Sequence, residues 1–133
     1  MDNKFASVWL PPLLWMLVMF CASAVTRPLS IIDPALHDKS AVGMLAHIVE
    51  YFILGFLLER AVSKWPFPLG FGVSTIGIGM SYAISDEMHQ YFVPGRFFQL
   101  SDVMLDSLGV LLGLAAWRAW TAYRASREAL AQH

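Results

Sequence analysis

Residues 8–26 read VWLPPLLWMLVMFCASAVT, a run of nineteen residues without a charged side chain. A membrane-spanning helix needs roughly 20 residues, at 1.5 Å of rise each, to cross a hydrocarbon core about 30 Å thick. The run therefore predicts one transmembrane helix. Its Ala-Ser-Ala end resembles a signal-peptidase site, but Pro11 and Pro12 fit a signal peptide poorly, so we expect the segment to be retained.

Three further stretches extend the pattern along the chain. They are apolar over about 40–58, 69–85 and 103–123, and each is close to the length of a membrane span. Together with the run at 8–26 they predict an all-α fold, an integral membrane bundle of four transmembrane helices. No linker or internal repeat divides residues 1–133, so we expect a single membrane domain.

The composition of the whole chain agrees with this fold class. Hydrophobic residues make up 57% and charged residues 14% of the sequence, against roughly 45–50% and about 25% in soluble domains. A soluble domain of 133 residues could not bury so much apolar surface, because a small fold leaves a large fraction exposed. The net charge of −1 gives no support to nucleic-acid binding. The single cysteine, Cys21, excludes an intrachain disulfide.

The distribution of basic residues predicts the orientation in the membrane. With four spans, both termini and the loop at 59–68 share one side, which carries six lysine and arginine residues. The other side carries three, namely Arg27, Lys39 and Arg96. By the positive-inside rule we expect cytoplasmic termini, with the loops at 27–39 and 86–102 outside.

Ionisable residues lie in the last three predicted helices, toward the same end. At 100° per residue, His47 and Glu50 share one face of the second helix. Asp102 and Asp106 share a narrow stripe of the fourth helix, which continues into a Gly-x-x-x-Gly spacing that lets two helices approach closely. Charged groups in mid-membrane usually face a partner or a water-filled cavity. We therefore expect a shared site in the bundle interior, although a structural hydrogen bond stays open for His47 and Glu50.

The segment that follows the third span is dense in groups able to exchange protons. Asp86, Glu87 and His89 are candidate catalytic residues, because a histidine titrates near neutral pH and can act with a carboxylate. With Asp102 and Asp106 they form a carboxylate–histidine set of the kind that binds cations. The spacing matches no zinc signature, and we predict neither a metal nor a cofactor.

Arg96 follows a Pro-Gly turn and is flanked by aromatic residues suited to the headgroup layer. A guanidinium binds phosphate or carboxylate through two parallel hydrogen bonds, so Arg96 is a candidate for recognising an anionic substrate. A salt bridge to a nearby carboxylate, or a contact with a lipid phosphate, is the alternative.

Three segments resemble the signatures of the VanZ-like family, in the family's order. They are HIVEY with LGFLL at 47–58, YAISDEMHQ with FVPGR at 82–96, and DVMLD with LG and G at 102–113. Met44 stands where many relatives have a basic residue, and Asp106 where many have asparagine. The resemblance implies a polytopic protein of the bacterial inner membrane. The family takes its name from a member linked to resistance to teicoplanin, which binds cell-wall precursors outside the membrane.

The leading hypothesis is that the outward cluster binds an anionic cell-envelope lipid or a lipid-linked cell-wall precursor. The residues expected to bind the substrate are His47, Glu50, Tyr51, Asp86, Glu87, His89, Gln90, Arg96, Asp102 and Asp106. A membrane enzyme that uses acid–base chemistry on such a substrate is the second hypothesis, and a proton- or ion-coupled transporter is the third. A homo-oligomer stays open, and so does the question of whether the chain is an enzyme.

Overall fold

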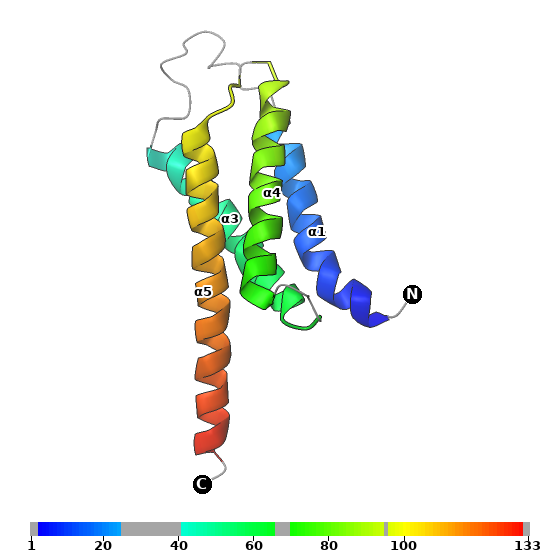
Figure 1. Ribbon diagram of the computed structural model, residues 1–133, viewed down its shortest axis with the longest axis vertical. Helices are drawn as coiled ribbons and strands as arrows, with labels where there is room; N and C mark the ends of the chain where they lie inside the picture. The colour runs from blue at the N-terminus through cyan, green and yellow to red at the C-terminus, as the bar shows by residue number, and fades with distance from the viewer. Residues whose placement is uncertain (1–2, 25–40, 66–69, 95, 132–133) are drawn as a thin grey trace.

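The computed structural model describes residues 3–24, 41–65, 70–94 and 96–131. Within these ranges the chain forms four helices and no strand, which confirms the all-α prediction (Figure 1). The helices are α1 (Asn3–Ser23), α3 (Ala41–Val62), α4 (Phe71–Tyr91) and α5 (Leu100–Leu130). Each helix extends beyond its predicted apolar run at one end or both; α4 and α5, for example, continue through ionisable residues such as Asp86 and Arg124. Arg27 and Lys39, on which part of the orientation rests, lie outside the described residues.

The two helices in closest contact are α3 and α5, and glycines make this contact possible. A Cβ atom on Gly109 would lie 2.6 Å from the carbonyl oxygen of Ile48. A Cβ atom on Gly113 would overlap the carbonyl oxygen of Phe52, one turn further along α3. The Gly-x-x-x-Gly spacing of α5 therefore brings the two backbones together, as the sequence predicts.

The α1 helix is attached to this pair and to α4 by its own aromatic and polar contacts. Trp15 donates its indole N–H to the carbonyl oxygen of Glu50 at 2.9 Å. The hydroxyl of Tyr82 on α4 donates to the carbonyl oxygen of Met16 at 2.6 Å. Trp15, Met16 and Tyr82 pack against a small apolar core, which is formed by Met19, Tyr51, Leu54, Leu58, Ala83 and Val110.

Large apolar side chains lie on the surface of the bundle, and some carboxylates lie in its interior beside the apolar core. Leu10, Leu13 and Leu17 of α1 are more than half exposed. Glu87 and Asp106, in contrast, are 0% and 1% exposed. Large apolar side chains on the outside and carboxylates on the inside are what a bundle surrounded by lipid requires.

Two of the described helices are long and apolar enough to cross a membrane, Lys4–Ser23 and Leu100–Leu130. The predicted four-span bundle is therefore established only as four helices with two candidate spans. The α3 helix is of similar length but contains Glu50, Glu59 and Arg60, and α4 contains Asp86 and Glu87. These ionisable residues lower the hydropathy of both helices, and several of them belong to the interior described below.

At the end of the bundle where α3 ends and α4 begins, one buried carboxylate joins three helices. Glu59 is 2% exposed; it accepts a hydrogen bond from Thr75 Oγ1 at 2.6 Å and pairs with Arg118 Nε at 3.0 Å. Arg118 lies beside Gly72, where any Cβ atom would collide with its guanidinium group. This three-residue contact fixes α3, α4 and α5 at the end opposite to the candidate site.

Candidate functional site

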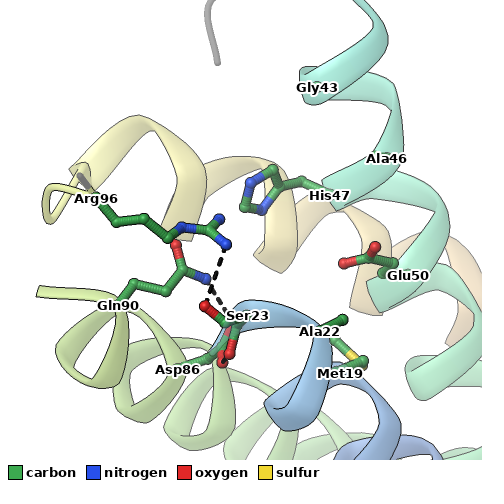
Figure 2. A pocket seen from close by; sticks show the side chains of 10 residues that line it. All are labelled: Met19, Ala22, Ser23, Gly43, Ala46, His47, Glu50, Asp86, Gln90 and Arg96. Carbon is green, nitrogen blue, oxygen red and sulfur yellow. Dashed lines mark hydrogen bonds between the residues drawn. The ribbon is translucent and has the colours of Figure 1, made fainter. Parts of the chain in front are cut away.

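The candidate site lies where α1 and α4 end and where α3 and α5 begin (Figure 1). A cavity of about 60 Å³ opens there between α1, α3, α4 and the connection from α4 to α5. Figure 2 shows the guanidinium group of Arg96 and the imidazole ring of His47 pointing toward each other across it. The residues that line the cavity are Met19, Ala22, Ser23, Gly43, Ala46, His47, Glu50, Asp86, Gln90 and Arg96.

One wall of the cavity is a hydrogen-bonded group on α1 and α4. Asp86 accepts from the hydroxyl of Ser23 at 2.7 Å and from the side-chain amide of Gln90 at 2.8 Å. Arg96 is 9% exposed and donates from Nη1 to the backbone carbonyl oxygen of Ser23 at 3.3 Å. The end of α1 therefore holds both the carboxylate and the guanidinium at the cavity.

His89 lies on the α1 side of α4 and is not among the residues that line the cavity. Its ring stacks on Phe20, with the ring centroids 4.2 Å apart, and its Nδ1 is 3.3 Å from Ser23 Oγ. Asp86 bonds the serine hydroxyl, whereas in a catalytic triad the carboxylate would hold the imidazole. Of the two carboxylates predicted to act with His89, Asp86 bonds the same serine hydroxyl that lies beside the imidazole, and Glu87 is directed toward α5.

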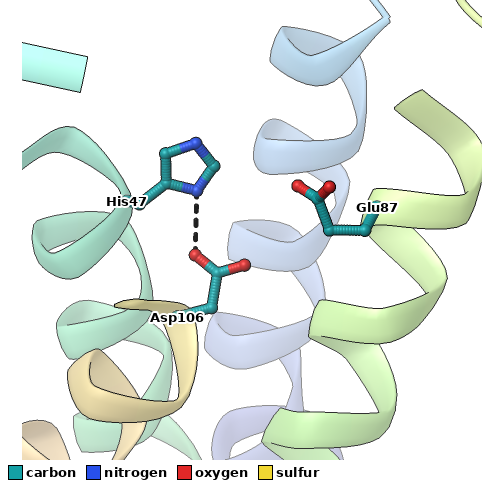
Figure 3. A group of neighbouring side chains, drawn as sticks. All are labelled: His47, Glu87 and Asp106. Atoms are coloured by element: carbon teal, nitrogen blue, oxygen red, sulfur yellow. Dashed lines mark hydrogen bonds and ion pairs between the residues drawn. The ribbon is translucent and has the colours of Figure 1, made fainter. Parts of the chain in front are cut away.

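A second polar group, which we call the carboxylate cluster, consists of His47, Glu87, Asp102 and Asp106. His47 Nδ1 lies 2.9 Å from Asp106 Oδ1, and His47 Nε2 lies 3.8 Å from Asp102 Oδ2. Figure 3 shows the carboxylate of Glu87 facing the His47–Asp106 pair from the neighbouring helix α4. The cluster brings together three of the helices on which the sequence placed ionisable groups.

Glu87 is the most completely buried member of the cluster. Its Oε2 accepts a hydrogen bond from the backbone N–H of Gln99, just before α5, at 2.9 Å. Among the described residues its Oε1 has no hydrogen-bond partner. One carboxylate oxygen is therefore used to position the start of α5, and the other faces the interior.

The sequence placed ten residues in one site, and the structure distributes eight of them over two adjoining groups, with Tyr51 and His89 outside both. His47 belongs to both groups, because its ring lines the cavity and bonds Asp106. Tyr51 lies in the apolar core, 1% exposed. The sequence analysis missed Met19, Ala22 and Ser23 of α1, since only the serine among them carries a polar group.

An open apolar groove of about 450 Å³ lies on the outer surface at the same end. It is lined by Met88, Tyr91, Phe92 and Phe98, of which Phe92 is 77% exposed. The groove is formed by the end of α4 and by the connection to α5, which also contains Arg96, so residues of the polar cavity and of the apolar surface are close in sequence.

Comparison with known proteins gave one match. A family model described as VanZ/LLP1 matches residues 8–121, a range that contains every residue of the cavity and of the carboxylate cluster. No curated protein and no solved structure matches the chain.

Proposed function

Because the chain belongs to the VanZ/LLP1 family, as the sequence resemblance indicates, we propose that it is a multi-pass membrane protein that binds the anionic headgroup of an envelope lipid. Arg96 and the cavity beside it are the proposed site. The observation that carries this proposal is a buried guanidinium group at a small polar cavity, with an exposed apolar groove at the same end of the bundle.

The proposed setting is the bacterial inner membrane, crossed four times, with both termini in the cytoplasm. Two candidate spans and the exposed apolar side chains of α1 support the membrane itself. The buried carboxylates support assigning α3 and α4 as spans, because ionisable groups inside a membrane bundle face one another and not lipid. The charge count of the sequence then places the cavity at the outer face.

The size of the cavity limits what can enter it. A volume of about 60 Å³ is small beside the 300–1,000 Å³, roughly, of pockets that enclose a drug-sized ligand. A phosphate or carboxylate group fits, whereas a complete lipid does not. The remainder of a lipid would lie outside, with an acyl or polyprenyl chain along the groove at Phe92 and Phe98.

The charged side chains at the cavity further restrict the chemical class of ligand that can bind. Glu50 and Asp86 line the same space as Arg96, and they would repel a bare anion. A headgroup that carries hydroxyl or amine donors next to its phosphate can bond these carboxylates while the phosphate bonds Arg96. A lipid-linked cell-wall precursor and an anionic phospholipid both have this chemistry.

We predict that Arg96→Ala lowers the affinity for such lipids by at least about 30-fold, or about 2 kcal/mol, since the lost partner is a buried charge. The measurement is native mass spectrometry of delipidated protein with phosphatidylglycerol, a sugar-linked polyprenyl pyrophosphate or neutral diacylglycerol as the probe. Binding of the first two probes but not of the third supports recognition of phosphate. The probe that binds more tightly shows which of the two lipid classes the site prefers.

Arg124→Ala is the matched control. Arg124 lies on the exposed end of α5, and among the described residues its side chain pairs with the similarly exposed Glu128. It should leave lipid affinity unchanged. Equal affinities of wild type and Arg96→Ala, with unchanged helical circular dichroism, would remove the proposed function.

The hydrogen-bonded His47–Asp106 pair favours one second candidate, a membrane enzyme. A carboxylate that orients an imidazole is the usual arrangement of a general base, and His47 lines the cavity. Incubation of the purified protein with a radiolabelled polyprenyl pyrophosphate distinguishes the two functions. A new labelled product indicates an enzyme, and saturable binding without product indicates a lipid-binding protein.

A further inference from the structure

His47, Glu87 and Asp106 offer one nitrogen and two oxygen ligand atoms from three different helices, and no two of these atoms are more than 4.8 Å apart. All three residues are buried, and they occupy positions on α3, α4 and α5 that the α3–α5 contact and the Gln99–Glu87 hydrogen bond hold in place. The group is therefore preorganised by the fold, not assembled from flexible surface side chains.

The spacing of the ligand atoms fits a metal ion. Two ligands at about 2.1 Å from a metal lie about 3.0 Å apart when they are at right angles and about 4.2 Å apart when they are opposite. The 2.9 Å between His47 Nδ1 and Asp106 Oδ1 corresponds to neighbouring ligands. Because no two of the three ligand atoms are more than 4.8 Å apart, at most a small rotation of the Glu87 side chain would bring all three to bonding distance from one ion.

The unpartnered oxygen of Glu87 is an independent observation. Glu87 is 0% exposed, its Oε1 has no hydrogen-bond partner among the described residues, and Figure 3 shows its carboxylate directed at the His47–Asp106 pair. A buried polar atom without a partner destabilises a fold, and a charged one does so more strongly. An ion between the three side chains would remove this destabilisation.

The balance of charge in the cluster leads to the same conclusion. Glu87, Asp102 and Asp106 are three carboxylates around a single imidazole. Carboxylates this close in a poorly solvated interior repel one another strongly. A divalent cation offsets two of these negative charges.

We propose that the carboxylate cluster binds one divalent metal ion through His47, Glu87 and Asp106. A donor set of one imidazole and two carboxylates without a thiolate suits Mn²⁺ or Zn²⁺. The ion takes the place of the proton between His47 Nδ1 and Asp106 Oδ1, and that proton moves to His47 Nε2 or to solvent. Asp102 Oδ2 lies 3.8 Å from His47 Nε2, so its negative charge faces the other nitrogen of the ring.

The test is calorimetric titration of EDTA-stripped full-length protein in dodecylmaltoside micelles with MnCl₂ and, separately, ZnCl₂. We expect one equivalent to bind, and Glu87→Gln or Asp106→Asn to lower the affinity by about 100-fold or more, since loss of a residue that merely supports a ligand already costs about 10–100-fold. Glu59→Gln is the control, because it neutralises another buried carboxylate at the opposite end and should leave metal affinity unchanged.

A second readout separates metal binding from a merely structural role. Electron spin-echo envelope modulation of bound Mn²⁺ should show coupling to an imidazole nitrogen in the wild type. This coupling should be absent in His47→Gln. In EDTA the Glu87→Gln protein should unfold at the same temperature as the wild type or above it, whereas added metal should raise the unfolding temperature of the wild type alone.

Absence of stoichiometric binding by the wild type would overturn the proposal whatever the variants do, and so would wild-type affinity in both Glu87→Gln and Asp106→Asn. The lipid proposal is tested separately, because the titration contains no lipid. Arg96→Ala, which removes a residue outside the three proposed ligands, should retain metal binding even where it abolishes lipid binding.

Discussion

The Gly113→Ala protein is expected to lose about 2–3 kcal/mol of folding free energy, although the change adds only a methyl group. That methyl would overlap the carbonyl oxygen of Phe52 and lie 2.6 Å from the backbone nitrogen of Phe56. Backbone atoms within a helix cannot rotate away as side chains do, so α3 and α5 must separate along their closest contact. Unfolding by sodium dodecyl sulfate in mixed micelles, followed by circular dichroism, measures the loss.

Gly77→Ala is the matched control for this change. It also lies inside a helix, but a Cβ atom there meets nothing within 4 Å. Alanine is a better helix former than glycine by up to about 1 kcal/mol, so the control should be neutral or slightly stabilising. If Gly113→Ala unfolded at the wild-type midpoint, the close α3–α5 contact described here would be wrong.

The second large effect is expected at the other end of the bundle, in Arg118→Met. This change leaves the 2% exposed carboxylate of Glu59 with the Thr75 hydroxyl as its remaining hydrogen-bond partner among the described side chains. Breaking a fully buried pair costs about 3–5 kcal/mol. Arg118 is 55% exposed, so solvent screens part of the interaction and we expect about 1–2 kcal/mol.

A double-mutant cycle checks the cause of this loss. Glu59→Gln removes the charge that Arg118→Met leaves unpaired, so the double variant should be more stable than Arg118→Met alone. The same detergent titration measures all four proteins. Losses that simply add would show that Arg118 stabilises the fold through packing and not through Glu59.

The helical spacing of polar and small residues in the sequence predicts which side of each helix faces the interior. The stripe of Asp102, Asp106, Gly109 and Gly113 lies along one side of α5 at helical spacing, and the structure places all four toward α3 or its neighbours. His47 faces the same interior, as its angle on the helix predicts. Helical geometry is sufficient in these cases because the angular position of a residue on its helix sets the direction in which its side chain points.

The division of the site into two groups could not be predicted in this way. Asp86 and Glu87 are adjacent in sequence and were assigned to one cluster, but consecutive residues on a helix point about 100° apart. Asp86 therefore faces Ser23 and α1, while Glu87 faces α5 and the connection before it. Which helix lies on which side of α4 depends on packing between distant segments.

The same reason explains the contacts that the sequence analysis missed. Ser23 was regarded as part of an apolar run, although its hydroxyl bonds Asp86, 63 residues away. Glu59 was regarded as a residue of a loop, but α3 continues to Val62 and buries it. A polar side chain at the edge of an apolar segment acquires its role from a partner that the local pattern does not contain.

Among the described residues, His47 is common to the cavity and the carboxylate cluster, since its ring lines the former and bonds Asp106 in the latter. A charge gained on one side of this ring changes the electrostatic work of binding on the other. Thermodynamic linkage then requires reciprocity: the factor by which a cation alters headgroup affinity is the factor by which the headgroup alters cation affinity. Under the two proposals, His47 would therefore couple the binding of the headgroup to the binding of the cation.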